Sequence, residues 1–132
     1  MNKRAAGHMA DMLDNRWSAT DVKTNATFTT ASVGDAQSAK EVRHLDFFHF
    51  AILNKNTLHS TMSVQIRDAS IAGTVLDQWA LIVGGSQVAQ VSPAGIHLTA
   101  TPGKGFFVTT DTVAPSVTAS VNMAGWTDQS TN

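Results

Sequence analysis

Histidines are the side chains of this sequence that could most readily hold a metal ion or carry a proton. Three candidate ligands, His44, Asp46 and His49, lie close together in the chain. Side chains of a regular β-strand alternate between its two faces. His44 and Asp46 would then share one face and His49 the other, so the three could not converge on one ion without a β-bulge. We therefore expect hydrogen-bonded or interface histidines here and at His59 and His97, and no metal site.

Two glycine-containing segments resemble functional loops without completing their patterns. Gly84-Gly85-Ser86 lacks the Gly-x-Ser-x-Gly elbow of serine hydrolases and stands where a hairpin turn is expected. Gly103-Lys104-Gly105 lacks the rest of the Walker pattern and its following helix. A glycosidase needs two carboxylates facing each other across a substrate. The acids of the C-terminal region mostly fall at turns or strand ends: Asp46, Asp68, Asp77, Asp111 and Asp128. We expect no catalytic residue and no cofactor.

Composition narrows the possible partners and compartments. Charged residues make up 14% of the 132 residues, well under the roughly 25% typical of soluble domains. The net charge is −1 and there is no basic run, which argues against nucleic acid and against an anionic membrane surface. No apolar stretch is long enough to span a membrane, and the first residues lack the apolar core of a signal peptide. The absence of cysteine excludes thiolate metal sites and fits synthesis in a reducing cytoplasm.

The region 42–132 reads as one β-sandwich domain. Short apolar segments with a period of two alternate there with turn residues. Strands are expected over 45–53, 60–67, 78–83, 87–91, 96–100, 106–110 and 117–123. No segment between them is long enough for a crossover helix. The fold class predicted is therefore all-β, a small antiparallel β-sandwich or jelly roll with an extended N-terminal arm.

The region 1–41 reads as that arm. Helical spacing of Met9, Met12, Leu13 and Trp17 allows a short helix at its start. Residues 18–40 are mostly polar, and their large apolar residues are Val22, Phe28 and Val33. Fixing about twenty residues costs on the order of 20 to 40 kcal/mol of backbone entropy. Since so few apolar residues cannot offset that cost, we expect a partner to hold the arm in place.

Aromatic pairs suggest subunit contacts in the β domain as well. Phe47-Phe48 and Phe106-Phe107 place rings on both faces of their strands, whereas a single sandwich has one interior. The surplus rings are expected at an interface. The residues predicted to contact a partner are Met9, Met12, Leu13, Trp17, Phe28, Phe48 and Phe107.

The order of strands resembles a known family of phage proteins. The resemblance rests on the segments LDFFHFAILN, STMSVQIRDAS, TVLDQWALIVGG, VSPAGIHLTATPGKGFFVTT and SVTASVNMAGW. They are similar to the small β-sandwich or jelly-roll decoration (cement, head-stabilising) proteins of tailed bacteriophages. The resemblance implies a non-enzymatic homotrimer on the capsid surface, bound to the major capsid protein or another virion protein and made in the host cytoplasm.

Two other classes of protein share these strand signals. A phage tail or fibre module would bind a surface glycan or another virion protein. A small jelly-roll hydrolase or cupin-like metalloprotein would carry out chemistry. Exposed aromatic rings beside polar loops would favour the first alternative, and a stoichiometric metal ion the second.

Overall fold

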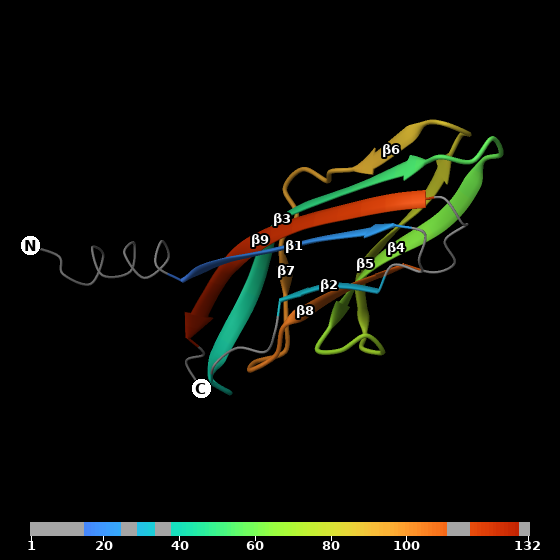
Figure 1. Ribbon diagram of the computed structural model, residues 1–132. Helices are drawn as coiled ribbons and strands as arrows, with labels where there is room; N and C mark the ends of the chain where they lie inside the picture. Colours follow the sequence, from blue (N-terminus) through green and yellow to red (C-terminus); the bar gives the residue numbers. More distant parts are fainter. Residues whose placement is uncertain (1–14, 25–28, 34–37, 111–116, 130–132) are drawn as a thin grey trace, which may run out of the picture.

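The computed structural model describes residues 15–24, 29–33, 38–110 and 117–129. These residues form strands and no helix, which confirms the predicted all-β class (Figure 1). The strands are β1 (Arg16–Thr24), β2 (Thr29–Val33), β3 (Glu41–Asn54), β4 (Ser60–Asp68), β5 (Val75–Val83), β6 (Val88–Val91), β7 (Leu98–Thr99), β8 (Phe106–Thr110) and β9 (Val117–Gln129).

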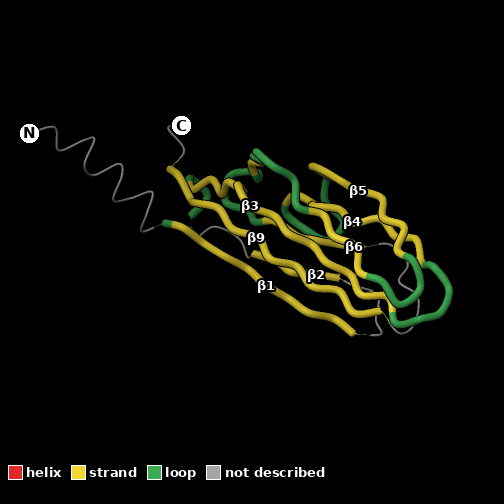
Figure 2. The backbone as a smooth tube through the Cα atoms, turned by 90° about the horizontal axis from the view of Figure 1, so that it is seen from above, coloured by secondary structure: helices red, strands yellow, loops and turns green. Residues whose placement is uncertain are grey.

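The strands pair as one long antiparallel ribbon folded back on itself. β4 pairs with β5 at its tip, and the pairs β3–β6, β2–β8 and β1–β9 follow outward. The ribbon then wraps, so that β9 also pairs with β3 and β8 with β4. A first sheet results with the order β1-β9-β3-β6, with β7 added to β3, and a second with the order β2-β8-β4-β5 (Figure 2). Of the two architectures that the sequence allowed, this nested pairing is the jelly roll.

The core lies between the two sheets and follows the alternation of side chains along the strands. In β4, Met62, Val64 and Ile66 are buried, as their spacing predicts. Phe48 from the first sheet stacks on Trp79 from the second at a centroid distance of 5.2 Å. The largest fully buried side chains are Phe48, Phe50, Phe106, Leu45, Ile52, Ile66 and Met123. Each contributes about 1.5 to 3 kcal/mol through burial, so the two sheets hold each other in register.

A β-bulge in β3 interrupts its alternation between Leu45 and Phe47. Leu45 and Phe48 are both buried although three residues apart, while Phe47 is 48% exposed. Gly125 pairs with Leu45 opposite the bulge, where a Cβ atom would meet the carbonyl oxygen of His44 at 1.7 Å. The bulge reverses the faces beyond it. The strand-parity argument for His44 and His49 is therefore wrong, since both lie on the outer face of the first sheet.

Part of the predicted N-terminal arm belongs to the sandwich. The expected extended stretch 18–40 contains most of β1 and all of β2. β1 pairs with β9 along its whole length, and β2 pairs with β8. Polar residues suffice because backbone hydrogen bonds to a neighbouring strand stabilise an edge strand without deep side-chain burial. For these two strands the domain itself offsets the ordering entropy that we had assigned to a partner.

The first predicted contact cluster cannot be placed in this fold. Met9, Met12 and Leu13, with the short helix expected there, lie outside the described residues, and so does Phe28. Their proposed contacts stay predictions.

Removing residues 1–24 tests whether β1 belongs to the folded unit. We expect the free energy of unfolding to fall by about 3 kcal/mol or more, because the side chain of Trp17 and the pairing with β9 are lost together. Urea unfolding of the purified chain measures this. Removal of residues 1–14 is the matched control, since it keeps every described strand. Equal stability of the two truncated chains would contradict the assignment.

Replacing the glycine at the bulge tests the close approach of β9 to β3. Gly125→Ala should lower the stability by about 3 kcal/mol, at the upper end of ordinary overpacking losses, because backbone atoms must shift to admit the methyl group. Gly95→Ala is the control, at a turn where φ is +68° and no atom lies within 4 Å of the new Cβ. There the cost is that of a left-handed backbone, about 1 to 2 kcal/mol. The bulge assignment fails if thermal denaturation finds Gly125→Ala no less stable than Gly95→Ala.

Candidate interaction surface

Charged side chains gather at the end of the sandwich where β3 begins and β9 finishes. Arg16 donates two hydrogen bonds to Asp46, at 2.9 and 3.1 Å. Asp68 accepts a hydrogen bond from the backbone N–H of Thr101. Other charged residues there are Glu41, Arg43, Lys104 and Asp128. Among the described side chains, Lys55 is the charged one at the opposite end.

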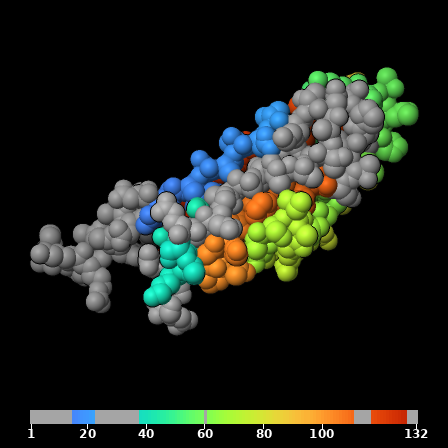
Figure 3. Space-filling view, turned by 60° about the horizontal axis from the view of Figure 1, so that its bottom comes forward, coloured from blue at the N-terminus to red at the C-terminus, as the bar shows by residue number. Residues whose placement is uncertain are grey.

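That opposite end exposes large apolar side chains. Leu58 is 76% and Ile82 75% exposed, and Val88 57%. Leu53 pairs with Val88, at 38% exposure. We call these four residues, Leu53, Leu58, Ile82 and Val88, the apolar end. Leu53 and Val88 face outward from the first sheet and Ile82 from the second, and Leu58 lies in the loop that connects the two sheets. In Figure 3 the loop 55–59, in green, lies at the end of the molecule that is remote from the start of β1, in dark blue.

A buried asparagine fixes the loop that carries Leu58. Asn54 is fully buried. Its side-chain Nδ2 donates to the carbonyl oxygens of Leu58 and Val83, at 2.8 and 3.3 Å. Its Oδ1 accepts from the backbone N–H of Asn56 at 3.0 Å. The loop is thus tied to the end of β5, so less conformational entropy remains to be lost when a partner binds.

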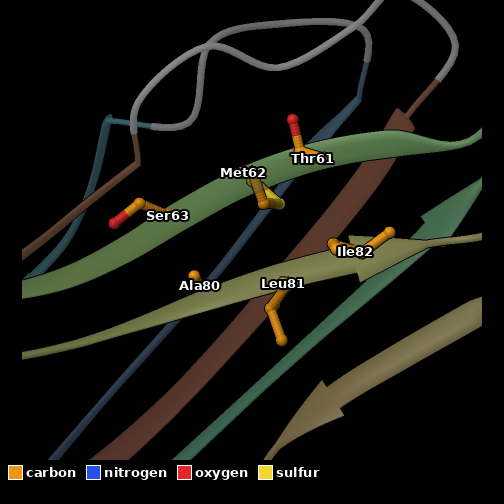
Figure 4. Close-up of a pocket in the computed structure, with 6 residues that line it drawn as sticks. All are labelled: Thr61, Met62, Ser63, Ala80, Leu81 and Ile82. Carbon is orange, nitrogen blue, oxygen red and sulfur yellow. The ribbon is translucent and has the colours of Figure 1, made fainter.

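An open hollow lies next to the apolar end. Its volume is about 340 Å³, and it is lined by residues 61–63 of β4 and 80–82 of β5. Figure 4 shows the sulfur of Met62 between the two strands, with the Thr61 hydroxyl above and Ile82 toward the end of β5. Most of the lining is apolar. A hollow of this kind suits a large side chain of a partner protein.

The outer face of the first sheet continues this uncharged surface. Val22 on β1 is 62% exposed and stands in line with Ser120 of β9 and Ala51 of β3. Small or neutral side chains fill the rows between Leu53 and Phe47. Toward the charged end, this uncharged face stops at the Arg16–Asp46 ion pair. Most of the described charge thus lies at one end, and four of the eight exposed large apolar side chains of the described residues form the apolar end.

The described histidines are divided between this outer face and the loops. His44 and His97 contact each other at the charged end, and His49 lies further along β3. Among the residues that the structure describes, no three His, Asp or Glu side chains are grouped as a metal site would require. Burial lowers the pKa of His44 below its usual range, and His97 lowers it further, while Asp128 acts in the opposite direction.

Two of the predicted contact residues serve the interior of their own chain. Phe48 is 1% exposed and stacked on Trp79, so it cannot reach a partner, and its prediction is corrected. The bulge is the reason, because it turns Phe47 outward instead. Trp17 is half-buried against Phe106 at a ring distance of 5.7 Å, and its Nε1 donates to the carbonyl oxygen of Trp126.

The partner contact predicted for the third described residue of that set stays a prediction. Phe107 lies on the outer face of the second sheet, half-buried, and pairs in register with Arg67. Sequence reasoning missed the apolar end. The available signal was Leu58, a large apolar residue within a polar turn, and Ile82, which stands out of phase with its buried neighbour Val83.

Comparisons with known proteins identify no family for this chain. No family model matches it, and no curated protein matches it. Solved structures give distant likenesses. A protein of Bacillus endospore appendages, described as disulfide-linked pili, is 12% identical, with 88% of each chain covered and a TM-score of 0.40. The coat protein of tobacco streak virus is 9% identical, with 90% of each chain covered and a TM-score of 0.38.

An enzyme is similar at the same level. Exo-β-1,3-galactanase from Phanerochaete chrysosporium is 9% identical, with 86% of this chain and 28% of that chain covered and a TM-score of 0.38. Likenesses at this level carry no argument on the function of this chain. Within the described part of the chain, no helix is long and apolar enough to cross a membrane.

Substituting Trp17 separates an internal role from a partner contact. Trp17→Ala should lower the free energy of unfolding of the isolated chain by about 2 to 3 kcal/mol, near the low end of Trp→Ala losses because the ring is only half-buried. Trp17→Phe should lose about 1 kcal/mol with the hydrogen bond to Trp126. Urea denaturation of dilute protein measures both. If Trp17→Ala left the free energy of unfolding unchanged, the original prediction that Trp17 contacts a partner would stand again.

Proposed function

We propose that this chain is a non-enzymatic structural protein of a virion, a capsid decoration protein that associates with copies of itself and attaches to a major capsid protein or another virion protein. The apolar end is the observation that carries the proposal. Large apolar side chains gather on a fixed loop and neighbouring strand ends, beside an open hollow and away from most of the charge. Surfaces of this kind are typical of protein–protein contacts.

The size of the apolar end explains why self-association would matter. Burial of its exposed parts is worth together about 5 kcal/mol at ordinary transfer energies. Bringing two proteins together costs an estimated 4 to 15 kcal/mol. A single copy would therefore attach weakly. Several linked copies that contact a repeating lattice would gain from effective concentration, which is the advantage that the predicted homotrimer offers.

The jelly-roll fold is compatible with this proposal but does not distinguish it from other functions. Jelly rolls include viral capsid domains, lectins and cupins, and one fold serves many functions. A surface short of charge and rich in Thr, Ser and Ala suits a chain that stays packed among other chains. The location proposed is the outer surface of the capsid.

The direct test is the composition of purified particles. Virions from the host that produces this chain should contain it in many copies, and antibodies against it should label intact heads. Mass spectrometry and immunogold electron microscopy check both points. Absence of the chain from purified virions would rule the proposal out, and labelling confined to tails would favour the tail or fibre alternative.

A pair of substitutions tests the apolar end itself. Leu58→Ser with Ile82→Ser should weaken attachment to particles by at least about tenfold, because roughly 3 kcal/mol of burial is removed. Ile71→Ser with Val75→Ser is the matched control. Those residues are also exposed apolar ones, 56% and 37%, but lie near Arg67 and Asp68 at the charged end. Cosedimentation with particles stripped of the protein measures the difference, and equal losses would contradict the assignment.

A further inference from the structure

His44 and His97 meet end-on at the outer face of the first sheet. Nδ1 of His44 lies 3.1 Å from Nε2 of His97, and the ring centroids are 5.3 Å apart. The separation of the two nitrogens is a hydrogen-bond distance, and among the described residues no third His, Asp or Glu side chain is grouped with the pair as a metal site would require. The two rings therefore share a hydrogen bond, for which one ring must supply the proton.

The shared hydrogen bond limits how many protons the pair can carry. With His97 donating through Nε2, the Nδ1 of His44 must be unprotonated. The Thr99 hydroxyl lies 3.2 Å from the same Nδ1 and can donate to it as well. A first added proton can go to the far nitrogen of His97 without loss of the bond. A second proton must go to Nδ1 of His44, which places two N–H groups and two positive charges face to face.

The surroundings favour one charge on the pair and oppose two. Trp126 of β9 lies against both rings, at 4.7 Å from His44 and 5.3 Å from His97, and an aromatic face attracts a single cation. Asp128, also on β9, favours the protonated form of His44. On β1 and β3, Arg16 and Asp46 bind each other. None of these groups offers a second carboxylate dedicated to the pair.

The two histidines add a side-chain contact to the pairing of β7 with β3, which is the shortest strand pairing in the described fold. β7 contacts β3 through two register pairs, His44 with Thr99 and Leu45 with Leu98. His97 directly precedes β7. The backbone N–H of Ala100 continues the pairing by donating to the carbonyl oxygen of Arg43 at 3.0 Å. Leu98 packs against the core and Ala100 is buried in it, so the side-chain bond adds a polar contact to an apolar anchor. A ladder of two register pairs has few other polar contacts to hold it closed.

We propose that His44 and His97 form a proton-sensitive latch, which holds β7 on β3 at neutral pH and releases it when both imidazoles become protonated. Release would free the segment around residues 96–100 and uncover the Trp126 ring on the outer face. The inference does not depend on the virion proposal, because it concerns the isolated chain.

The direction of the pH effect follows from the lowered pKa of His44. A histidine whose pKa is lower in the folded state binds fewer protons there than in the unfolded state. Its contribution to stability is complete above the ordinary value near 6.5 and is lost as the pH falls from there toward the lowered pKa. Acidification therefore weakens the latch, and alkaline pH does not.

Hydrogen exchange of the Ala100 amide measures the latch directly. Between pH 7.5 and pH 5 its protection factor, corrected for the intrinsic exchange rate, should fall about tenfold, because opening the latch releases a histidine that then takes up protons more readily. Amides at the centre of β9 should keep their protection factors over the same pH range. The lower limit of pH 5 is chosen because protein carboxylates generally remain ionised there.

Two variants make the result decisive. His97→Gln keeps a neutral donor for Nδ1 of His44 at every pH, so the part of the fall caused by the second positive charge should be lost, while the part caused by burial of His44 remains. The fall should therefore be clearly smaller than in the unmodified chain. His59→Gln, in an exposed loop, should leave the tenfold fall intact. A fall of unchanged size in His97→Gln, or no fall in the unmodified chain, would overturn the latch. A stoichiometric zinc complex at pH 7.5 that protects Ala100 would replace it with a metal site.

Discussion

The pairing of β9 with two partners at once is the interaction on which the rest of this structure depends. On one side β9 holds β1, and on the other it holds β3 along nearly its whole length. Its inward residues, among them Val121 and Met123, fill the core. Its outward residues form the uncharged face and supply Trp126 to the histidine pair. Because a glycine in β9 stands opposite the bulge of β3, the same pairing decides which residues of β3 face outward.

Residue patterns predicted the C-terminal strands well, because each has either a buried run or a clear alternation. The segment Ser60 to Arg67 is the plainest case, and β4 extends it by a single residue. β1 and β2 were missed for a physical reason. An edge strand draws its stability from backbone bonds to a neighbour, and for these two strands the paired residues are between 73 and 110 positions away, outside any local pattern.

Prediction of the contact surface was limited by a different effect. The choice of Phe48 over Phe47 assumed strict alternation through β3, and one extra residue at the bulge reversed it. A bulge has no sequence signature in this strand, since its cause, the close approach of Gly125, lies on another element. The proximity of His44 to His97 was hidden in the same way, because two residues 53 positions apart meet only through the placement of β7.

The nested ribbon also has a consequence for the folding of the chain during its synthesis. Trp17 and the residue that accepts its hydrogen bond are 109 positions apart, so the first strand has no partner until the ribosome has made the last one. At a few to twenty residues per second, β1 stays unpaired for several seconds or more on each nascent chain. Its polar sequence, which concealed it as a strand, keeps it soluble during that wait and discourages pairing with neighbouring nascent copies.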